Sequence, residues 1–331
     1  MKQPGFWSNP PTRPGILARL LRPLSALYAA GTARRLQQTA YKATIPVICI
    51  GNINIGGTGK TPTAIALLLR LQEQGHQPHI VSRGYGGRLE GPVLVKEREH
   101  SAADVGDEPL LLAAFAPTWV SRDRAKGVQS AERNGATVIL LDDGFQNPSV
   151  SKDVSIVVVD AANGFGNGQV IPAGPVREPV KTGLSRADLV LTIGNETAQM
   201  QFEQLWGPRI SPPRARGELK PLQTGMDWAG QNFLAFAGIG NPAKFFATLH
   251  DLGADIRRAE ALDDHQHLSP ALLTRLEAEA RSLGAQLVTT EKDAARLPIS
   301  FRQKVITLPV RLSVEDGEAV AKAILTKAPA P

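Results

Sequence analysis

The segment Asn54–Thr61, with the sequence Asn-Ile-Gly-Gly-Thr-Gly-Lys-Thr, constrains the fold of this chain more than any other feature. The apolar run Ile45–Ile50 precedes it, and the amphipathic stretch Thr61–Gln74 follows it. A buried strand, a glycine-rich loop and a helix in this order form a P-loop, in which backbone amides and the helix N-terminus bind phosphate groups. The segment therefore predicts a nucleotide phosphate site inside an α/β fold.

Each part of this loop has an expected task. Lys60 would reach the β- and γ-phosphates, and the Thr61 hydroxyl would ligate Mg²⁺. The strict pattern has glycine where Asn54 stands, but asparagine tolerates left-handed backbone better than most residues, so we expect the loop to keep its shape. The phosphate cradle would be formed by Asn54, Ile55, Gly56, Gly57, Thr58, Gly59, Lys60 and Thr61.

Two acidic residues follow a second apolar run. Val138–Leu141 leads directly into Asp142 and Asp143, which places carboxylates at the carboxyl end of a predicted strand, where open α/β sheets bind ligands. We expect this pair to hold Mg²⁺ directly or through water. The run Ile156–Asp160 has the same form, but we interpret Asp160 as an ordinary strand end, because Asp142 is followed by a second acid and by Gly144-Phe145-Gln146.

Apolar runs alternate with helical patterns from Ile45 onward, which is typical of a parallel sheet with helices on both faces. The proline-rich stretch Gly207–Gly225 is expected to be a linker. Before it, the predicted strands are Ile45–Ile50, His79–Ser82, Val138–Leu141, Ser155–Val159 and Asp188–Ile193. After it, the predicted strands are Asn232–Ala237, Asp255–Ala259, Gln286–Thr290 and Val305–Leu308, with helices beginning at Pro242 and Ser269.

These patterns predict three parts: an N-terminal segment (residues 1–44), an α/β core with the P-loop (45–225) and a smaller C-terminal α/β domain (226–331). The single cysteine, Cys49, lies in an apolar run and is expected in the core, so a disulfide framework is excluded. Gly238–Ala243 matches a dinucleotide-binding fingerprint, but this signal is weak alone. A zinc site is a further alternative, although its residues lack a clear ligand pattern: Asp263, Asp264, His265 and His267.

The positive charge of the chain is concentrated at its N-terminal end. Nine basic residues precede the first acidic residue, Glu73, whereas the remaining 28 of the 37 basic residues are outnumbered by 31 acidic ones. Such polarity favours an anionic surface as a partner, either a membrane with anionic lipids or a nucleic acid.

The segment Ile16–Tyr28 distinguishes these two surfaces. Its apolar residues recur at helical spacing and arginines point the other way, a pattern typical of a helix lying in a membrane interface. It is too short, and too often interrupted, to span a bilayer. Two alternatives are an ordinary amphipathic helix packed on the protein core and a P-loop NTPase that acts on nucleic acid through its basic N-terminus. The apolar residues are mostly leucines, whereas nucleic-acid binding favours exposed aromatic residues among the bases.

Several motifs in this order resemble the tetraacyldisaccharide 4′-kinase family. They are Asn52–Pro62, Ser82–Gly87, Gly106–Pro109, Asp142–Gln146 and Gly174–Pro179, and in the C-terminal half Phe236–Pro242, Asp264-His265 and Thr290–Asp293. The resemblance covers nearly the whole chain. It departs from the family at Asn147 and Gln266, where the family often has histidine, so neither residue is assigned acid–base work.

The resemblance implies a P-loop kinase-type fold and an ATP- and Mg²⁺-dependent enzyme of lipid A biosynthesis. The family transfers the γ-phosphate of ATP to the 4′-hydroxyl of a tetraacylated glucosamine disaccharide 1-phosphate. It works at the cytoplasmic face of the inner membrane of Gram-negative bacteria, which agrees with the predicted interfacial helix. Neither a nucleic acid nor an obligate protein partner is expected.

Roles for single residues follow from the same resemblance. Asp107 is the expected catalytic base, with His265 as its partner and Lys60 as the catalytic cation of the P-loop. The alternative for Asp107 is a helix N-cap, since Glu108-Pro109 begins an apolar stretch, and the alternative for His265 is a solvated loop histidine. The expected Mg²⁺ or lysine partners are Thr61, Glu108, Asp142 and Asp143. The expected substrate contacts are Arg83, Gln146, Arg177 and Glu178, and the alternative for Arg83 is a residue that braces the sheet.

Overall fold

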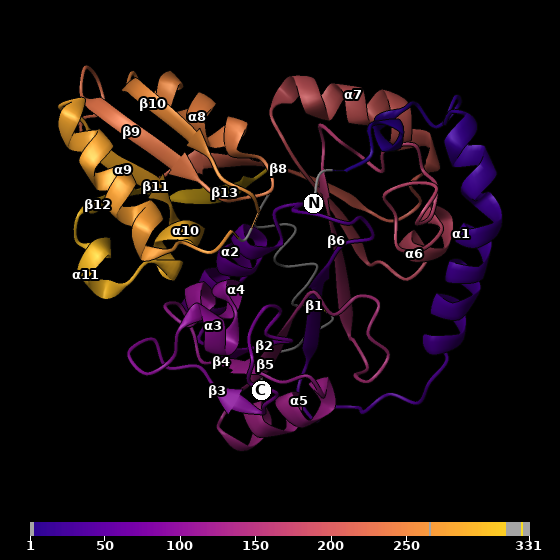
Figure 1. Ribbon diagram of the computed structural model, residues 1–331. Coiled ribbons are helices and arrows are strands. Elements are labelled where there is room, and N and C mark those ends of the chain that lie inside the picture. Colours follow the sequence, from indigo (N-terminus) through magenta and orange to yellow (C-terminus); the bar gives the residue numbers. More distant parts are fainter. Residues whose placement is uncertain (1–2, 265, 316–325, 327–331) are drawn as a thin grey trace.

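The computed structural model describes residues 3–264, 266–315 and 326. A nine-stranded sheet and the helices around it form the larger part of the molecule (Figure 1). The strand order is β13-β8-β7-β6-β1-β5-β2-β4-β3. The seven inner strands are parallel, and β3 and β13 pair antiparallel at the two edges. The strands are β1 (Val47–Gly51), β2 (Pro78–Ser82), β3 (Val93–Leu94), β4 (Thr118–Val120), β5 (Val138–Asp142), β6 (Val154–Asp160), β7 (Leu189–Ile193), β8 (Arg214–Pro221) and β13 (Val310–Val314).

Helices cover both faces of this sheet, as predicted. Along β1, Val47 and Cys49 pack into one hydrophobic cluster and Ile48 and Ile50 into another, because successive side chains of a strand point to opposite faces. Helices α5, α6 and α7 contribute to the first cluster, and α2 and α4 to the second. The helices of this part are α1 (Ile16–Arg35), α2 (Lys60–Glu73), α3 (Ala102–Val105), α4 (Asp107–Leu112), α5 (Arg124–Arg133), α6 (Val180–Leu184) and α7 (Glu196–Trp206), with 3₁₀ turns at Gly5–Ser8 and Gly207–Arg209.

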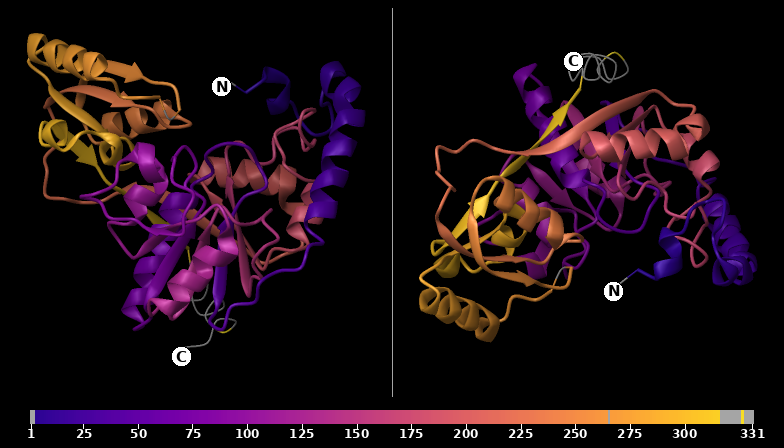
Figure 2. Two further views of the ribbon diagram at one scale, coloured as in Figure 1. Left: turned by 60° about the horizontal axis from the view of Figure 1, so that its bottom comes forward. Right: turned by 90° about the horizontal axis from the view of Figure 1, so that it is seen from above.

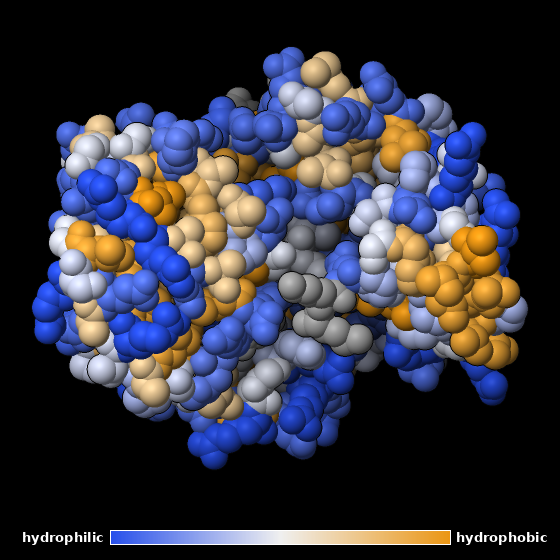
Figure 3. Space-filling view, turned by 45° about the horizontal axis from the view of Figure 1, so that its top comes forward, coloured by the Kyte–Doolittle hydropathy of each residue, from blue (hydrophilic) through white to orange (hydrophobic). Residues whose placement is uncertain are grey.

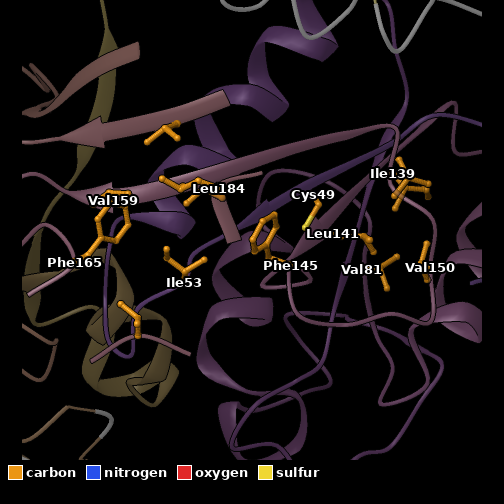
Figure 4. Packing of buried hydrophobic residues seen from close by; sticks show 14 of the residues in the cluster. Cys49, Ile53, Val81, Ile139, Leu141, Phe145, Val150, Val159, Phe165 and Leu184 are labelled. Atoms are coloured by element: carbon orange, nitrogen blue, oxygen red, sulfur yellow. The ribbon is translucent and has the colours of Figure 1, made fainter. Parts of the chain in front are cut away.

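The first cluster confirms that Cys49 is a core residue. Cys49 is fully buried, and burial raises the pKa of its thiol to about 11. Figure 4 shows its sulfur close to the ring of Phe145 and to Leu141. This packing lies directly beneath the loop that follows Asp142, so the core supports the acidic end of β5.

A second, smaller sheet lies beside the first in the C-terminal half (Figure 2). Its four parallel strands have the order β10-β9-β11-β12, and apolar residues are buried on both faces. Pro242 and Pro270 occupy the first turns of its two longest helices, where proline is well tolerated. The elements are β9 (Asn232–Ala237), β10 (Asp255–Ala261), β11 (Gln286–Thr290), β12 (Val305–Leu308), α8 (Pro242–Asp251), α9 (Pro270–Ser282), α10 (Glu291–Arg296) and α11 (Ile299–Arg302).

Two predictions about the junction of the parts are wrong. The expected linker Gly207–Gly225 contains β8, an eight-residue strand that pairs with β7 and β13. Pro213 precedes the strand and Pro221 ends it, so the prolines flank its ladder and do not interrupt it. The predicted C-terminal domain (226–331) also wrongly includes β13, because this strand pairs with β8 at the edge of the large sheet.

Helix α1 packs on the larger part with a narrow polar and small-residue face. Ala18, Ser25 and Thr32 are buried, and the Ser25 hydroxyl donates to the Val170 carbonyl at 2.6 Å. The apolar residues point outward, with Leu20 70% and Leu27 72% exposed. The alternative of an ordinary amphipathic helix, with its leucines in the core, is therefore wrong. An apolar patch is visible at the right of the molecule in Figure 3, on the side where α1 lies in Figure 1.

Candidate active site

The P-loop joins β1 to α2 in the predicted way. Gly59 adopts a left-handed conformation (φ 96°) at the N-cap of α2, and a Cβ there would lie 2.6 Å from the Cδ1 atom of Ile193. The amide of Asn52, a fully buried residue, reaches the Gly56 carbonyl at 3.3 Å and the Thr58 hydroxyl at 3.2 Å. Asn52 therefore connects Gly56 and Thr58 and stabilises the glycine-rich turn between them. This role was not predicted from the sequence.

Asn54 is accommodated for a different reason from the one expected. Its backbone is not left-handed; among the described residues other than glycine, only Asp143 has a positive φ. The Asn54 side chain is buried, and its amide donates to the Gly164 carbonyl at 2.8 Å. This side chain braces the loop from the side, so a glycine is not required at this position.

The acidic end of β5 lies beside the P-loop because β5 pairs directly with β1. The Asp143 carboxylate is 3.6 Å from the Lys60 ammonium and 3.3 Å from the Arg177 guanidinium. Burial opposes ionisation of Asp143, but the charges of Lys60, Arg177 and Arg124 outweigh it and lower the pKa of this carboxyl group. Asp143 is thus an ionised carboxylate that pairs with two cations beside the P-loop.

Asp142 has a different environment. It is 2% exposed; one carboxylate oxygen accepts a hydrogen bond from Ser82 at 2.9 Å, and the other, Oδ1, is buried without a hydrogen-bond partner among the residues that the structure describes. Burial raises the pKa of Asp142 to about 6, and the nearby charges of Glu108 and Asp143 contribute to this rise. An orphaned buried oxygen among negative charges is the environment that a bound cation would stabilise.

A buried arginine fixes this edge of the sheet, and sequence reasoning missed it. Arg124 is 3% exposed, and its guanidinium donates to the carbonyls of Val81 and Asp142, both at 2.8 Å. It therefore links the carboxyl ends of β2 and β5, the strands that end in Ser82 and Asp142. The only sequence signal was an arginine at the first position of a helix, which has no intrinsic functional meaning.

Asp107 and Glu108 approach from the start of α4. Asp107 is 6% exposed, and one of its carboxylate oxygens accepts a hydrogen bond from the Glu108 amide at 2.9 Å. The N-cap position of α4 belongs to Gly106, so the alternative that makes Asp107 the N-cap is wrong. Lys292, on α10 of the small domain, lies 3.2 Å from the Glu108 carboxylate and 3.9 Å from that of Asp107. His265, the predicted partner of Asp107, lies outside the described residues.

The residues expected to contact substrate form a linked group with one exception. Arg177 donates to Asp143 and, at 3.3 Å, to the side-chain oxygen of Gln146. Gln146 in turn donates to Glu178 at 3.0 Å. Glu178 is 2% exposed and also accepts a hydrogen bond from the Arg186 guanidinium, so its buried carboxylate holds the Gln146 amide in place. The exception is Arg83, which is exposed beyond the end of β2.

The donor set fits a magnesium ion. Mg²⁺ in phosphoryl-transfer sites is held by one or two carboxylates together with phosphate and water oxygens. Asp142, with its unpartnered Oδ1, and the Thr61 hydroxyl at the start of α2 supply such donors. Within the described ranges, no three His, Cys, Asp or Glu side chains form a metal site by themselves, so the zinc alternative has no support there.

A P-loop, a neighbouring strand with two aspartates at its carboxyl end and a parallel sheet with helices on both faces define a P-loop nucleotide-binding protein. The comparisons specify which one. Residues 17–329 match the family model described as tetraacyldisaccharide-1-P 4′-kinase. The chain belongs to this family, whose members are kinases that phosphorylate a lipid A precursor with ATP. This assignment replaces the alternative of an NTPase that acts on nucleic acid.

Relatives and a solved structure agree over nearly the full length. The chain is 61% identical to the tetraacyldisaccharide 4′-kinase of Dinoroseobacter shibae, with 99% of this chain and 98% of that protein covered. It is 57% identical to the enzyme of the same name from Jannaschia sp., with 98% of each covered. The LpxK structure of Aquifex aeolicus in complex with ATP superposes with a TM-score of 0.76 at 25% identity, over 95% of this chain and 100% of that one.

Proposed function

We propose that this kinase transfers the γ-phosphoryl group of ATP to the 4′-hydroxyl of a tetraacylated glucosamine disaccharide 1-phosphate at the carboxyl edge of the large sheet. The observation that carries the proposal is the meeting of three groups there: Lys60 of the P-loop, the Asp142–Asp143 pair and the Asp107–Glu108 pair. Lys60 forms an ion pair with Asp143, and the negative charge of Glu108 is close enough to Asp142 to raise the pKa of Asp142.

Asp107 is the proposed base. Its carboxylate orients the 4′-hydroxyl and accepts the proton as the hydroxyl oxygen bonds to the γ-phosphorus. The bond from that phosphorus to the bridging oxygen breaks at the same centre, and ADP leaves. Asp107 is buried, with only 6% of the residue exposed, which suits this task because bulk water competes little for its carboxylate oxygens. His265 is the proposed partner that orients Asp107.

The negative charge of the transferring group is balanced by the chain's own cations. Lys60 faces the β- and γ-phosphates, and the loop amides from Asn54 to Thr61 surround them. A magnesium ion held by Asp142 and Thr61, with Glu108 and Asp143 nearby, would supply further positive charge. Arg177 and Gln146, which already contact each other, are the proposed contacts to the disaccharide, together with the exposed Arg83.

The same proposal includes a membrane location. No helix in the described part of the chain is both long and apolar enough to cross a bilayer. Helix α1 instead exposes Ile16, Leu20 and Leu27, at 75%, 70% and 72%, beside Arg19 and Arg22. This combination suits a helix lying in the interface of an anionic membrane, which we propose to be the cytoplasmic face of the bacterial inner membrane. An enzyme placed there meets an acyl-chain substrate without extracting it.

Incubation of the protein with ATP, Mg²⁺ and the tetraacylated disaccharide 1-phosphate in vesicles tests the proposal directly. Mass spectrometry of the lipid should detect one added phosphate, and fragmentation should locate it on the 4′ position. A folded protein that adds no phosphate, or adds it elsewhere on the sugar, would contradict the proposal. Omission of Mg²⁺ is the matched control, and it should abolish the product.

A further inference from the structure

Lys292, a cation of the other domain, lies close to the proposed base. Its ammonium lies 3.2 Å from Glu108 and 3.9 Å from Asp107, and only 20% of its side chain is exposed. We propose that Lys292 is a positioning residue of the phosphoryl-transfer site, which holds the carboxylates of Asp107 and Glu108 in their working orientation. The inference rests on the role of Asp107 proposed above.

The need for such a cation follows from the charges at this edge. Asp107 and Glu108 are consecutive acids at the start of α4, and Glu108 also acts unfavourably on the charge of Asp142. Without a neighbouring cation, adjacent carboxylates repel one another and turn toward solvent. An ammonium between two partly buried carboxylates offsets this repulsion and restricts both side chains.

The helix that carries Lys292 is held by a buried ion pair between the next residue, Asp293, and Arg296, one turn further along α10. Asp293 is 0% exposed; its carboxylate accepts hydrogen bonds from the Gly238 amide at 3.0 Å and the Thr290 hydroxyl at 2.7 Å, and it pairs with Arg296. Arg296 also donates to the Gln266 carbonyl at 3.0 Å. The pair therefore joins α10 to the loop 238–241 and to Gln266.

The loop 238–241 reaches the P-loop. A Cβ built on Gly240 would lie 3.7 Å from the Gly57 amide nitrogen, so the small domain touches the phosphate cradle at this point. The Asp293–Arg296 pair thus holds the loop at Gly240 and the helix that carries Lys292 in one rigid arrangement. When this loop sits on the P-loop, Lys292 is brought to Asp107 and Glu108.

A second ion pair between the domains provides the matched control. The Lys244 ammonium on α8 lies 3.1 Å from both carboxylate oxygens of Asp160, at the end of β6. The other hydrogen bonds to the Asp160 side chain come from Ala162 and Asn163. Both lysines therefore connect the same two domains through a carboxylate, but only Lys292 contacts the proposed catalytic acids.

The test compares Lys292→Met, Lys292→Arg, Lys244→Met and Asp107→Asn in steady-state assays with ATP and the lipid disaccharide in detergent micelles. Misplacement of a reacting group by about 1 Å costs roughly 100-fold in rate, so Lys292→Met should lower kcat by about 10- to 100-fold. The KM for ATP should change by less than about threefold, because uniform binding is not what the variant removes. Lys292→Arg should recover most of kcat, and Lys244→Met should keep it near the wild-type value.

A second variant, in which the charge at position 292 is restored chemically, keeps the inference testable even if Lys292→Met does not fold. Lys292→Cys can be treated with 2-bromoethylamine, which alkylates the thiol and rebuilds an ammonium side chain of nearly the same length. The natural Cys49 is 0% exposed, so the reagent should spare it in the folded protein. Treatment should restore kcat to Lys292→Cys and leave the wild-type enzyme unchanged.

Three results would overturn the inference: an unchanged kcat in Lys292→Met, a loss confined to the KM for ATP, or equal losses in Lys292→Met and Lys244→Met. The second would make Lys292 a nucleotide contact, and the third would make it a general domain connection. Failure of the underlying proposal has a different signature, since Asp107→Asn would then retain kcat whatever the lysine variants do.

Discussion

The Lys60 ammonium, at the start of α2, and the Asp143 carboxylate, directly after β5, lie 3.6 Å apart beyond the carboxyl ends of two adjacent parallel strands, β1 and β5. Among the described residues other than glycine, Asp143 alone has a positive φ (49°), a conformation outside the extended region of the strand that precedes it. The ion pair therefore connects the P-loop lysine to the acidic end of β5. This arrangement leads to the first prediction.

Lys60→Ala should reduce phosphoryl transfer by at least about 100- to 1000-fold, the typical cost of removing one group that stabilises a charged transition state. The fold should persist, because Asp143 keeps its contact with Arg177. Turnover of the lipid disaccharide and thermal melting should be measured together. Lys96→Ala, a change at an exposed lysine paired with Glu99, is the control and should retain full turnover. Wild-type turnover in a folded Lys60→Ala protein would contradict the P-loop assignment.

Asp107→Asn should lower kcat by about 100- to 10,000-fold, the usual contribution of a general base, and leave the affinity for ATP nearly unchanged. The amide keeps the shape of the carboxylate but cannot accept the hydroxyl proton. His265→Ala should cause a smaller loss, and the double variant should lose less than the two single losses combined if the residues act as one unit. Additive losses would argue against the pairing of Asp107 with His265. Asp255→Asn, at the surface of the small domain, is a suitable control.

Local sequence patterns predicted much of this fold correctly. The P-loop helix was expected at Thr61–Gln74 and occupies Lys60–Glu73, and β9, β11 and β12 have their predicted bounds. Continuous apolar runs and glycine or proline boundaries are local signals, so one segment suffices to identify each element. The same holds for Asp142 and Asp143, which follow a run of four apolar residues.

Long-range pairing explains what the sequence could not predict. Strand β8 exposes half of its residues and begins beside prolines, and its pairing with β13 joins residues about ninety positions apart in the chain. The roles of Arg124 and Lys292 likewise depend on partners that only the tertiary structure brings near. Neither residue belongs to a local pattern from which its carboxyl or carbonyl partner could be inferred.

Glu132 provides a prediction about pH. Its carboxylate accepts hydrogen bonds at 2.7 Å from the Tyr41 hydroxyl and from both the hydroxyl and the amide of Thr44, which anchors the connection to β1 on helix α5. Burial alone would raise the pKa of Glu132, but these hydrogen bonds outweigh it and lower this pKa below 4.5. A lowered pKa in the folded state means that the ionised carboxylate adds stability above the unfolded-state pKa, and that this stability is lost on acidification.

Glu132→Gln should therefore reduce the free energy of unfolding by about 1 kcal/mol at pH 7, a value discounted for partial exposure. The difference between variant and wild type should begin to shrink as the pH falls below about 4.5, where the unfolded carboxylate becomes protonated, and should be lost once the pH falls through the lower folded-state pKa of Glu132. Urea unfolding at several pH values measures both quantities. The exposed Glu97→Gln should cause no such difference at any pH, and a Glu132→Gln deficit that persists unchanged in acid would refute the assignment.

The last prediction concerns helix α1. Replacement of Leu20, Leu24 and Leu27 by serine should weaken binding to anionic vesicles and lower activity on vesicle-embedded lipid. These side chains are 70%, 54% and 72% exposed, so their removal creates no core cavity and the melting temperature should not fall. Activity on substrate in detergent should decrease less, because the helix contributes no group to the phosphate site. Vesicle flotation, thermal melting and the two activity assays together measure these effects.

The matched control changes exposed apolar residues on another helix. Met200 and Leu205 of α7 are 51% and 42% exposed, and their replacement by serine should leave vesicle binding unchanged. The basic residues supply a second contribution, since each arginine near an anionic leaflet adds about 1 kcal/mol of attraction. Binding of the wild-type protein should therefore weaken when salt is raised or anionic lipid is omitted. Full vesicle binding by the triple serine variant would remove α1 as the membrane contact, whatever its effect on activity.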